Sequence, residues 1–119
     1  GIYKIVGFNP NTIYHLAIKI NYPNEFDRRM AKKDKRFNLG GDIFIHGSNV
    51  SVGCLAVGDI AIEELFVLIV DVGMKNTGII ISPVDFRKYN LKEKLTLKFY
   101  TPWVNDLYYK INSELHQYN

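Results

Sequence analysis

The sequence predicts an α+β fold, and three observations support this class. Short runs rich in Ile, Val, Tyr and Phe, as in β-strands, lie at 2–6, 13–22 and 42–46. The stretch 59–73 carries apolar residues at helical spacing. The chain of 119 residues shows no repeat, linker or low-complexity tract. We therefore expect a single domain over 1–119, with strands that are mainly antiparallel or mixed.

The N-terminal half predicts two strands followed by a short helix. Asn-Pro-Asn after the first strand predicts a turn at 8–12. The second strand, 13–22, ends at Pro23, because proline cannot donate to a sheet ladder. Asn24 is then expected to cap a helix over 25–33, since its side chain can accept from the first turn.

The stretch 59–73 predicts the longest helix of the chain. Asp59 is expected at its N-cap and Gly73 just past its end. Four apolar residues share one face and are expected in the core: Ile62, Leu65, Phe66 and Ile69.

The C-terminal part predicts a short buried strand, an ambiguous segment and a last helix. The strand covers 77–82, and the segment 91–100 fits either a helix or a strand. Pro102 suits the first turn of the last helix. Three aromatic residues of this helix are expected in the core: Trp103, Tyr108 and Tyr109.

Charge and cysteine content exclude several classes of site. The net charge is +3, and six basic residues lie between 28 and 36, which we interpret as a solvated helix and loop rather than a nucleic-acid site. A single cysteine excludes an internal disulfide and any multi-cysteine metal centre. No apolar run reaches the roughly 18–20 residues of a transmembrane segment. We therefore expect no metal, cofactor, nucleic-acid partner or transmembrane segment in this chain.

The segment 45–54, Ile-His-Gly-Ser-Asn-Val-Ser-Val-Gly-Cys, is the best candidate for chemistry. It contains His46, one of three histidines, and Cys54, the only cysteine. A thiol attacks as thiolate, which a nearby imidazole promotes. The plain alternative is a small buried thiol beside a structural histidine.

The same segment resembles the active site of L,D-transpeptidase catalytic domains of the YkuD type. Ile45-His46-Gly47 is followed by Ser51-Val52-Gly53-Cys54 and then by a helix with an acidic start, within 42–69. Flanking segments are similar to the YafK-like branch of murein L,D-transpeptidases. The resemblance implies a mixed β-sheet sandwich or barrel with flanking helices. Gly1 resembles the last glycine of an N-terminal element of the family, so we expect the N-terminal strands to be missing.

The resemblance also implies roles for five residues. Cys54 would be the nucleophile and His46 the general base. The carbonyl group of Gly47 would orient the imidazole, and the N–H groups of Gly53 and Cys54 would form an oxyanion hole. Ser51 would brace the loop, or its hydroxyl group would simply close a turn.

The residues that would contact the substrate are harder to identify, because the sequence departs from the commoner family pattern. Val52 replaces a histidine and Ala56 replaces an arginine that is expected to help fix the substrate. Arg87 could supply the missing cation. Tyr14 or His15 could contact substrate, although packing in the second strand explains them as well.

The resemblance implies an enzyme of the bacterial periplasm or cell envelope. It would form a thioester on Cys54 from a diaminopimelate-containing peptidoglycan stem peptide and transfer the acyl group to an amine. Two alternatives stay open. One is a hydrolase that releases a peptidoglycan-linked lipoprotein or trims stems, and the other is a non-catalytic peptidoglycan-binding module.

Overall fold

The structure is a computed structural model that describes residues 1–89 and 101–118. The chain forms two compact units. One, here called the N-terminal unit, is Tyr3–Ile79, and the other, the C-terminal unit, combines Gly1–Ile2 with Ile80–Asn119. The candidate site lies in the N-terminal unit. The single domain expected over 1–119 stays a prediction.

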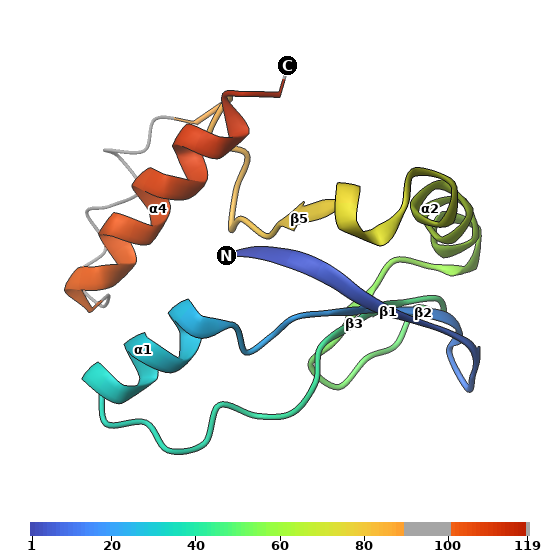
Figure 1. The fold of residues 1–119 in the computed structure, drawn as a ribbon, viewed down its shortest axis with the longest axis horizontal. Coiled ribbons are helices and arrows are strands. Elements are labelled where there is room, and N and C mark those ends of the chain that lie inside the picture. Colours follow the sequence, from blue (N-terminus) through green and yellow to red (C-terminus); the bar gives the residue numbers. More distant parts are fainter. Residues whose placement is uncertain (90–100, 119) are drawn as a thin grey trace. The chain divides into compact units, whose positions relative to one another are not determined.

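The described residues include a five-stranded mixed sheet, and Figure 1 labels β1, β2, β3 and β5. Its strand order is β4-β3-β2-β1-β5. The β1–β2 and β2–β3 pairs are antiparallel, whereas β3 and β4 run parallel. This combination of a mixed sheet and separate helices is compatible with the expected α+β class. The bounds of the strands are β1 Ile2–Thr12, β2 His15–Ile20, β3 Phe44–His46, β4 Leu55–Ala56 and β5 Gly78–Ile80.

Strand β1 is longer than the sequence predicts. The segment 8–12, expected as a turn, continues the strand, with Phe8 opposite Ile18 and Asn9 opposite Ala17. The proline in this segment is tolerated because the register is irregular between Asn9 and Thr12, where a ladder N–H is not required. The turn falls instead between Thr12 and β2.

Helix α1, Glu25–Lys33, confirms the predicted cap and bounds. Asn24 accepts a hydrogen bond from the N–H group of Asp27, whose carboxylate accepts in return from the N–H group of Asn24. Six exposed basic residues follow on α1 and the loop after it, as expected for a solvated surface: Arg28, Arg29, Lys32, Lys33, Lys35 and Arg36.

Helix α2, Asp59–Val72, packs on β2 and β3 through the predicted face. Ile62 and Ile69 are buried, while Phe66 is half-buried and contacts the ring of Phe8 with centroids 4.8 Å apart. Leu65 is also half-buried rather than in the core.

The predicted N-cap of α2 is wrong by one residue. Gly58 is the N-cap, with a left-handed φ of 85° that favours glycine. Asp59 is the first helical residue, and its carboxylate accepts from the N–H group of Ser48, outside the helix. Gly73 ends the helix as predicted, with its N–H group donating to the carbonyl group of Ile69.

The C-terminal unit contains helix α4, Pro102–Leu115, with proline in its first turn as predicted. Phe86 and Ile111 form its core, and Tyr108 packs on Phe86. Tyr109 is 51% exposed, so its expected core position is wrong, and Trp103 is half-buried. The ambiguous segment 91–100 lies outside the described residues. In the described ranges, no helix has the length and apolarity needed to cross a membrane.

Candidate active site

His46 is the last residue of β3 and is held between β2 and β4. It is only 3% exposed. Its Nδ1 lies 2.6 Å from the carbonyl oxygen of Gly47. Because a carbonyl oxygen can only accept, Nδ1 must carry the proton. The neutral imidazole therefore has its lone pair on Nε2, so this nitrogen can act as a base.

Tyr14 covers one face of this imidazole. It lies in the turn between β1 and β2, and its ring stacks on that of His46 with centroids 4.5 Å apart and an angle of 27° between the planes. Such stacking restricts rotation of the imidazole ring. Tyr14 thus supports His46 in addition to lining the space beside it.

Ser51 connects the imidazole with the cysteine loop. Its Oγ lies 3.3 Å from Nε2 of His46 and accepts from the N–H group of Cys54 at 2.8 Å. The same hydroxyl donates to the carbonyl group of Cys54 at 2.9 Å. Since a hydroxyl has one proton, Ser51 can donate either to the carbonyl group of Cys54 or to Nε2 of His46, but not to both at once.

Cys54 and His46 line the same cavity of about 210 Å³. Tyr14 lines this space as well, together with Asn9 and Thr12 from β1. The thiol is free and partly exposed. Strand β4 begins directly after Cys54 and pairs in parallel with β3, with Ile45 opposite Leu55, so this pairing holds Cys54 beside β3 at the β4 edge of the sheet.

The two glycines of the segment differ in why they are needed. A Cβ on Gly47 would lie 2.6 Å from Oδ1 of Asp59 and 2.7 Å from the carbonyl oxygen of Tyr14, so no side chain fits. Gly53 has a left-handed φ of 95°, which lets the chain turn into Cys54. The Cys54 N–H group, a predicted oxyanion donor, is bonded to Ser51 here.

His15 lies beside a second hollow that Tyr14, Asn49 and Asp59 also line. Its φ of 71° is left-handed, and its Nε2 pairs with Oε1 of Glu63 at 2.7 Å. Both side chains are largely exposed. This pair joins two residues that lie 48 positions apart, and no local pattern in the sequence indicates it.

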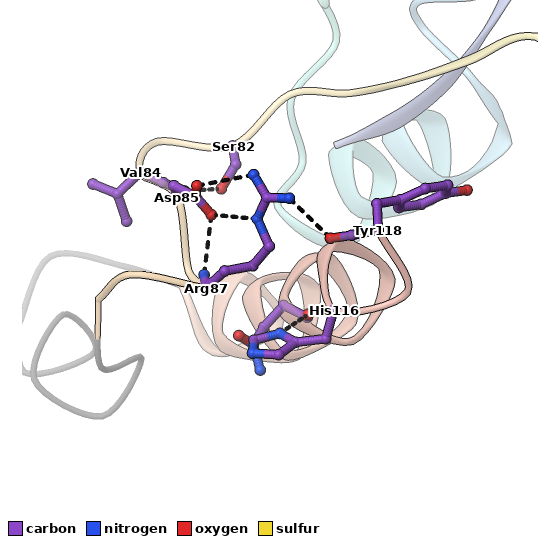
Figure 2. Close-up of polar contacts among 7 residues, drawn as sticks. Ser82, Val84, Asp85, Arg87, His116 and Tyr118 are labelled. Atoms are coloured by element: carbon purple, nitrogen blue, oxygen red, sulfur yellow. Dashed lines mark hydrogen bonds and ion pairs between the residues drawn. The ribbon is translucent and has the colours of Figure 1, made fainter.

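Arg87 lies in the C-terminal unit, where its guanidinium group is bound on two sides (Figure 2). Nε and Nη2 donate to the two carboxylate oxygens of Asp85 at 2.9 and 3.0 Å, and Nη1 donates to the carbonyl group of Tyr118 at 2.9 Å. The hydrogen bond from Arg87 lowers the pKa of Asp85 to about 2. A role for Arg87 in binding substrate stays a prediction.

A second contact that the sequence does not indicate joins Asp59 and Ser48. Ser48 has a left-handed φ of 62°, which is uncommon for a residue other than glycine. A contact across 11 residues of irregular chain leaves no periodic signal in a sequence. In the described ranges, no group of three or more His, Cys, Asp or Glu side chains is placed to hold a metal ion.

Comparison with known proteins agrees with the resemblance. The chain is 29% identical over 97 residues to "Putative L,D-transpeptidase YafK" of Escherichia coli, in both the K12 and the O157:H7 strains. The alignment covers 79% of this chain, but the chain spans only 37% of those relatives. No family model and no solved structure matches the chain. The similarity confirms, at the level of the family, the resemblance to the YafK-like L,D-transpeptidases.

Proposed function

We propose that this chain carries the catalytic centre of an L,D-transpeptidase, a cysteine-dependent enzyme that acts on peptidoglycan stem peptides. The observation that carries the proposal is the placement of His46. Its imidazole is buried, its Nδ1 lies 2.6 Å from the carbonyl oxygen of Gly47, and it lines one cavity together with Cys54. Similarity to YafK supports the class of the enzyme. The sandwich or barrel fold of the YkuD type is part of this proposal.

In the first step, the Cys54 thiolate attacks the carbonyl carbon of diaminopimelate in a stem peptide. The bond between this carbon and the following nitrogen breaks, and a thioester forms on sulfur. The leaving amine needs a proton, which Nε2 of His46 donates after having taken it from the Cys54 thiol. In the second step, an acceptor amine attacks the thioester, His46 takes one proton from that amine, the bond between carbon and sulfur breaks, and the sulfur leaves as the thiolate beside the protonated imidazole.

Ser51 must move its hydrogen bonds during this cycle. The N–H group of Cys54 can stabilise an oxyanion only after it has left the Ser51 hydroxyl. The same hydroxyl lies at Nε2, on the side of the imidazole that must reach the sulfur or the leaving amine. We therefore propose that bound substrate displaces the Ser51 hydroxyl from both positions.

The size of the cavity limits what enters it. A volume of about 210 Å³ is below the roughly 300–1,000 Å³ typical of pockets that enclose a whole small ligand. It suits the residue at the bond that is cleaved, with the rest of the stem outside. In this proposal, Asn9 and Thr12 contact that residue and Tyr14 packs against it, since all three line the cavity.

Hydrolysis is the second candidate function, because Cys54 is partly exposed and water can reach a thioester there. Water in place of an amine would trim stems or release a lipoprotein linked to peptidoglycan. Both reactions place the enzyme in the bacterial cell envelope, in the periplasm.

Mass spectrometry of muropeptides tests these proposals. Purified sacculi are incubated with the 119-residue chain and, separately, with the Cys54→Ala variant. Stem-to-stem links or exchanged terminal residues that require Cys54 support the transpeptidase. Shortened stems or released protein fragments that require Cys54 support the hydrolase. Unchanged muropeptides, combined with sedimentation of the chain with sacculi, would support the peptidoglycan-binding module instead.

A further inference from the structure

One peptide group, between Gly47 and Ser48, is hydrogen-bonded at both ends. Its carbonyl oxygen accepts from Nδ1 of His46 at 2.6 Å. Its N–H group donates to Oδ1 of Asp59 at 2.7 Å. A single amide thus lies between the buried imidazole and a carboxylate, and its two bonds are short enough to be strong.

The neighbouring backbone is fixed as well. The carbonyl group of His46 accepts from Val57, and that of Ser48 accepts from Gly58, each at 3.0 Å. The N–H group of Gly47 donates to Leu16 in β2 at 3.1 Å. These bonds attach the turn after β3 to β2 and to the start of α2. They hold Ser48 at its left-handed φ, a conformation that persists only where the surroundings determine it.

The carboxylate acts on the imidazole through this amide. A negative charge at the N–H end draws its proton and increases electron density on the carbonyl oxygen, because hydrogen bonds in a chain polarise one another. A stronger acceptor at Nδ1 favours the tautomer that leaves Nε2 unprotonated, and it also stabilises the imidazolium. Asp59 itself does not touch the imidazole.

We propose that Asp59 is a positioning residue that fixes the tautomer and orientation of His46 through the Gly47–Ser48 peptide group. The inference rests on the proposed function for its catalytic meaning, whereas the tautomer can be measured without any substrate. In a Ser-His-Asp triad, the carboxylate contacts the histidine directly and fixes its tautomer and orientation. Asp59 would have the same effect on His46 through one peptide group.

Any test must distinguish the effect of Asp59 on the imidazole from the effects of the other titratable groups around it. Tyr14 stacks on the ring from the β1–β2 turn, and Cys54 lines the same cavity from the loop before β4. The His15–Glu63 pair lies on the far side of Gly47, where a Cβ would be 3.1 Å from that of His15. The His15→Gln variant therefore serves to assign the His46 signals and to exclude an effect of this pair.

The test is ¹⁵N NMR of the imidazole nitrogens in the 119-residue chain, at a pH where histidine is neutral. We expect His46 to be protonated on Nδ1 in the wild type and to become a mixture of tautomers in Asp59→Asn. Alkylation of Cys54 by iodoacetamide at pH 7 should slow about tenfold in the same variant, the order expected for loss of one charge-assisted hydrogen bond. Asp71→Asn is the matched control, since Asp71 is an exposed acid on the same helix.

Several outcomes would overturn the proposal. Protonation of His46 on Nε2 in the wild type would do so without any variant. An Asp59→Asn variant that keeps both the wild-type tautomer and the alkylation rate would do so as well. Asp59→Glu guards against misfolding, because it retains the charge and should restore the Nδ1 tautomer in part; failure to do so in a folded chain counts against the proposal.

The experiments give different results when the proposed function is wrong and when the positioning role of Asp59 is wrong. If the wild type leaves sacculi unchanged while Asp59→Asn still shifts the tautomer, the control of His46 by Asp59 stands and the transpeptidase assignment falls. If the wild type modifies sacculi and the tautomer does not depend on Asp59, the assignment stands and the positioning role falls.

Discussion

His46 and Arg87 are both held by hydrogen bonds to neighbouring residues, but they differ in what their remaining donor and acceptor groups can do. Arg87 directs three of its nitrogens at the Asp85 carboxylate and a backbone carbonyl group, at the surface of the C-terminal unit. His46 is buried, and only Nδ1 is bound to the backbone. Its Nε2 lies 3.3 Å from the Ser51 hydroxyl, and its imidazole lines the cavity that Cys54 also lines.

This difference is what the proposed role of His46 in proton transfer requires. A guanidinium group bound by a carboxylate on two nitrogens gains geometry and keeps its charge at any ordinary pH. An imidazole fixed at one nitrogen has a defined tautomer and keeps the other nitrogen for chemistry. For proton transfer, the number of hydrogen-bond partners of a side chain matters less than whether these partners leave one of its atoms able to react.

The largest effect is expected from Gly47→Ala, which disturbs the backbone that holds Nδ1 of His46. The new Cβ would lie 2.7 Å from the carbonyl oxygen of Tyr14, so the backbone must shift. We expect the free energy of unfolding to fall by about 3 kcal/mol and Cys54 alkylation to lose its dependence on His46. Urea denaturation measures the first and iodoacetamide kinetics the second. Gly41→Ala is the control, because its Cβ would meet nothing within 4 Å.

A smaller effect is expected when the stacked ring is removed. In Tyr14→Leu, the imidazole loses the partner 4.5 Å away that restricts its rotation. We expect Cys54 alkylation at pH 7 to slow about fivefold, the range of a stacked aromatic pair. Tyr14→Phe keeps the ring and should react like the wild type. Equal rates in Tyr14→Leu would show that the stacking does not support His46.

Alkaline pH acts on the N-terminal unit through Tyr3. Burial, together with Asp27 3.2 Å away, raises the pKa of Tyr3 well above its ordinary value. A raised pKa means that the folded state holds the proton more tightly, so stability is lost as pH rises above roughly 10. We expect the urea midpoint to fall less between pH 8 and pH 11 in Tyr3→Phe than in the wild type. An equal fall of the urea midpoint in both proteins would contradict the assignment of this loss of stability to Tyr3.

Acid pH acts on the C-terminal unit, with the smallest effect. Because the Arg87 hydrogen bond lowers the pKa of Asp85 from 3.8 to about 2, the contact stabilises above pH 3.8 and is lost as pH falls through 2. Both side chains are near the surface, so we expect no measurable change in the urea midpoint. The NMR signal of the Arg87 Nε–H group should instead move between about pH 4 and 2, and Asp85→Asn should abolish that step.

Local sequence signals predicted the elements that depend on neighbours in the chain. Asn24 and Asp27 form a reciprocal cap within one helical turn, so the start of α1 was predicted correctly. Ile62 and Ile69 are buried on the predicted face of α2. The strand over 8–12 was missed because pairing with β2 outweighs the turn preference of Asn-Pro-Asn.

The site was predictable only in part, for the same reason. His46, Gly47 and Cys54 lie in one short segment with a recognisable spacing, and the structure brings His46 and Cys54 to one cavity. The two-residue strand β4 was not predicted, because its partner β3 alone defines it. The Asp59 carboxylate looked like a helix cap, since nothing in the sequence indicates that Ser48 adopts a left-handed conformation next to it.

The most direct test of the central claim is the rate of Cys54 alkylation by iodoacetamide against pH in the wild type and in His46→Gln. If Nε2 of His46 serves the thiol, the wild type should react at pH 6.5 at least about tenfold faster than the variant, and the two profiles should converge at alkaline pH where any thiol ionises. Equal rates across the whole range would contradict the claim and would leave Cys54 an ordinary thiol beside a structural histidine.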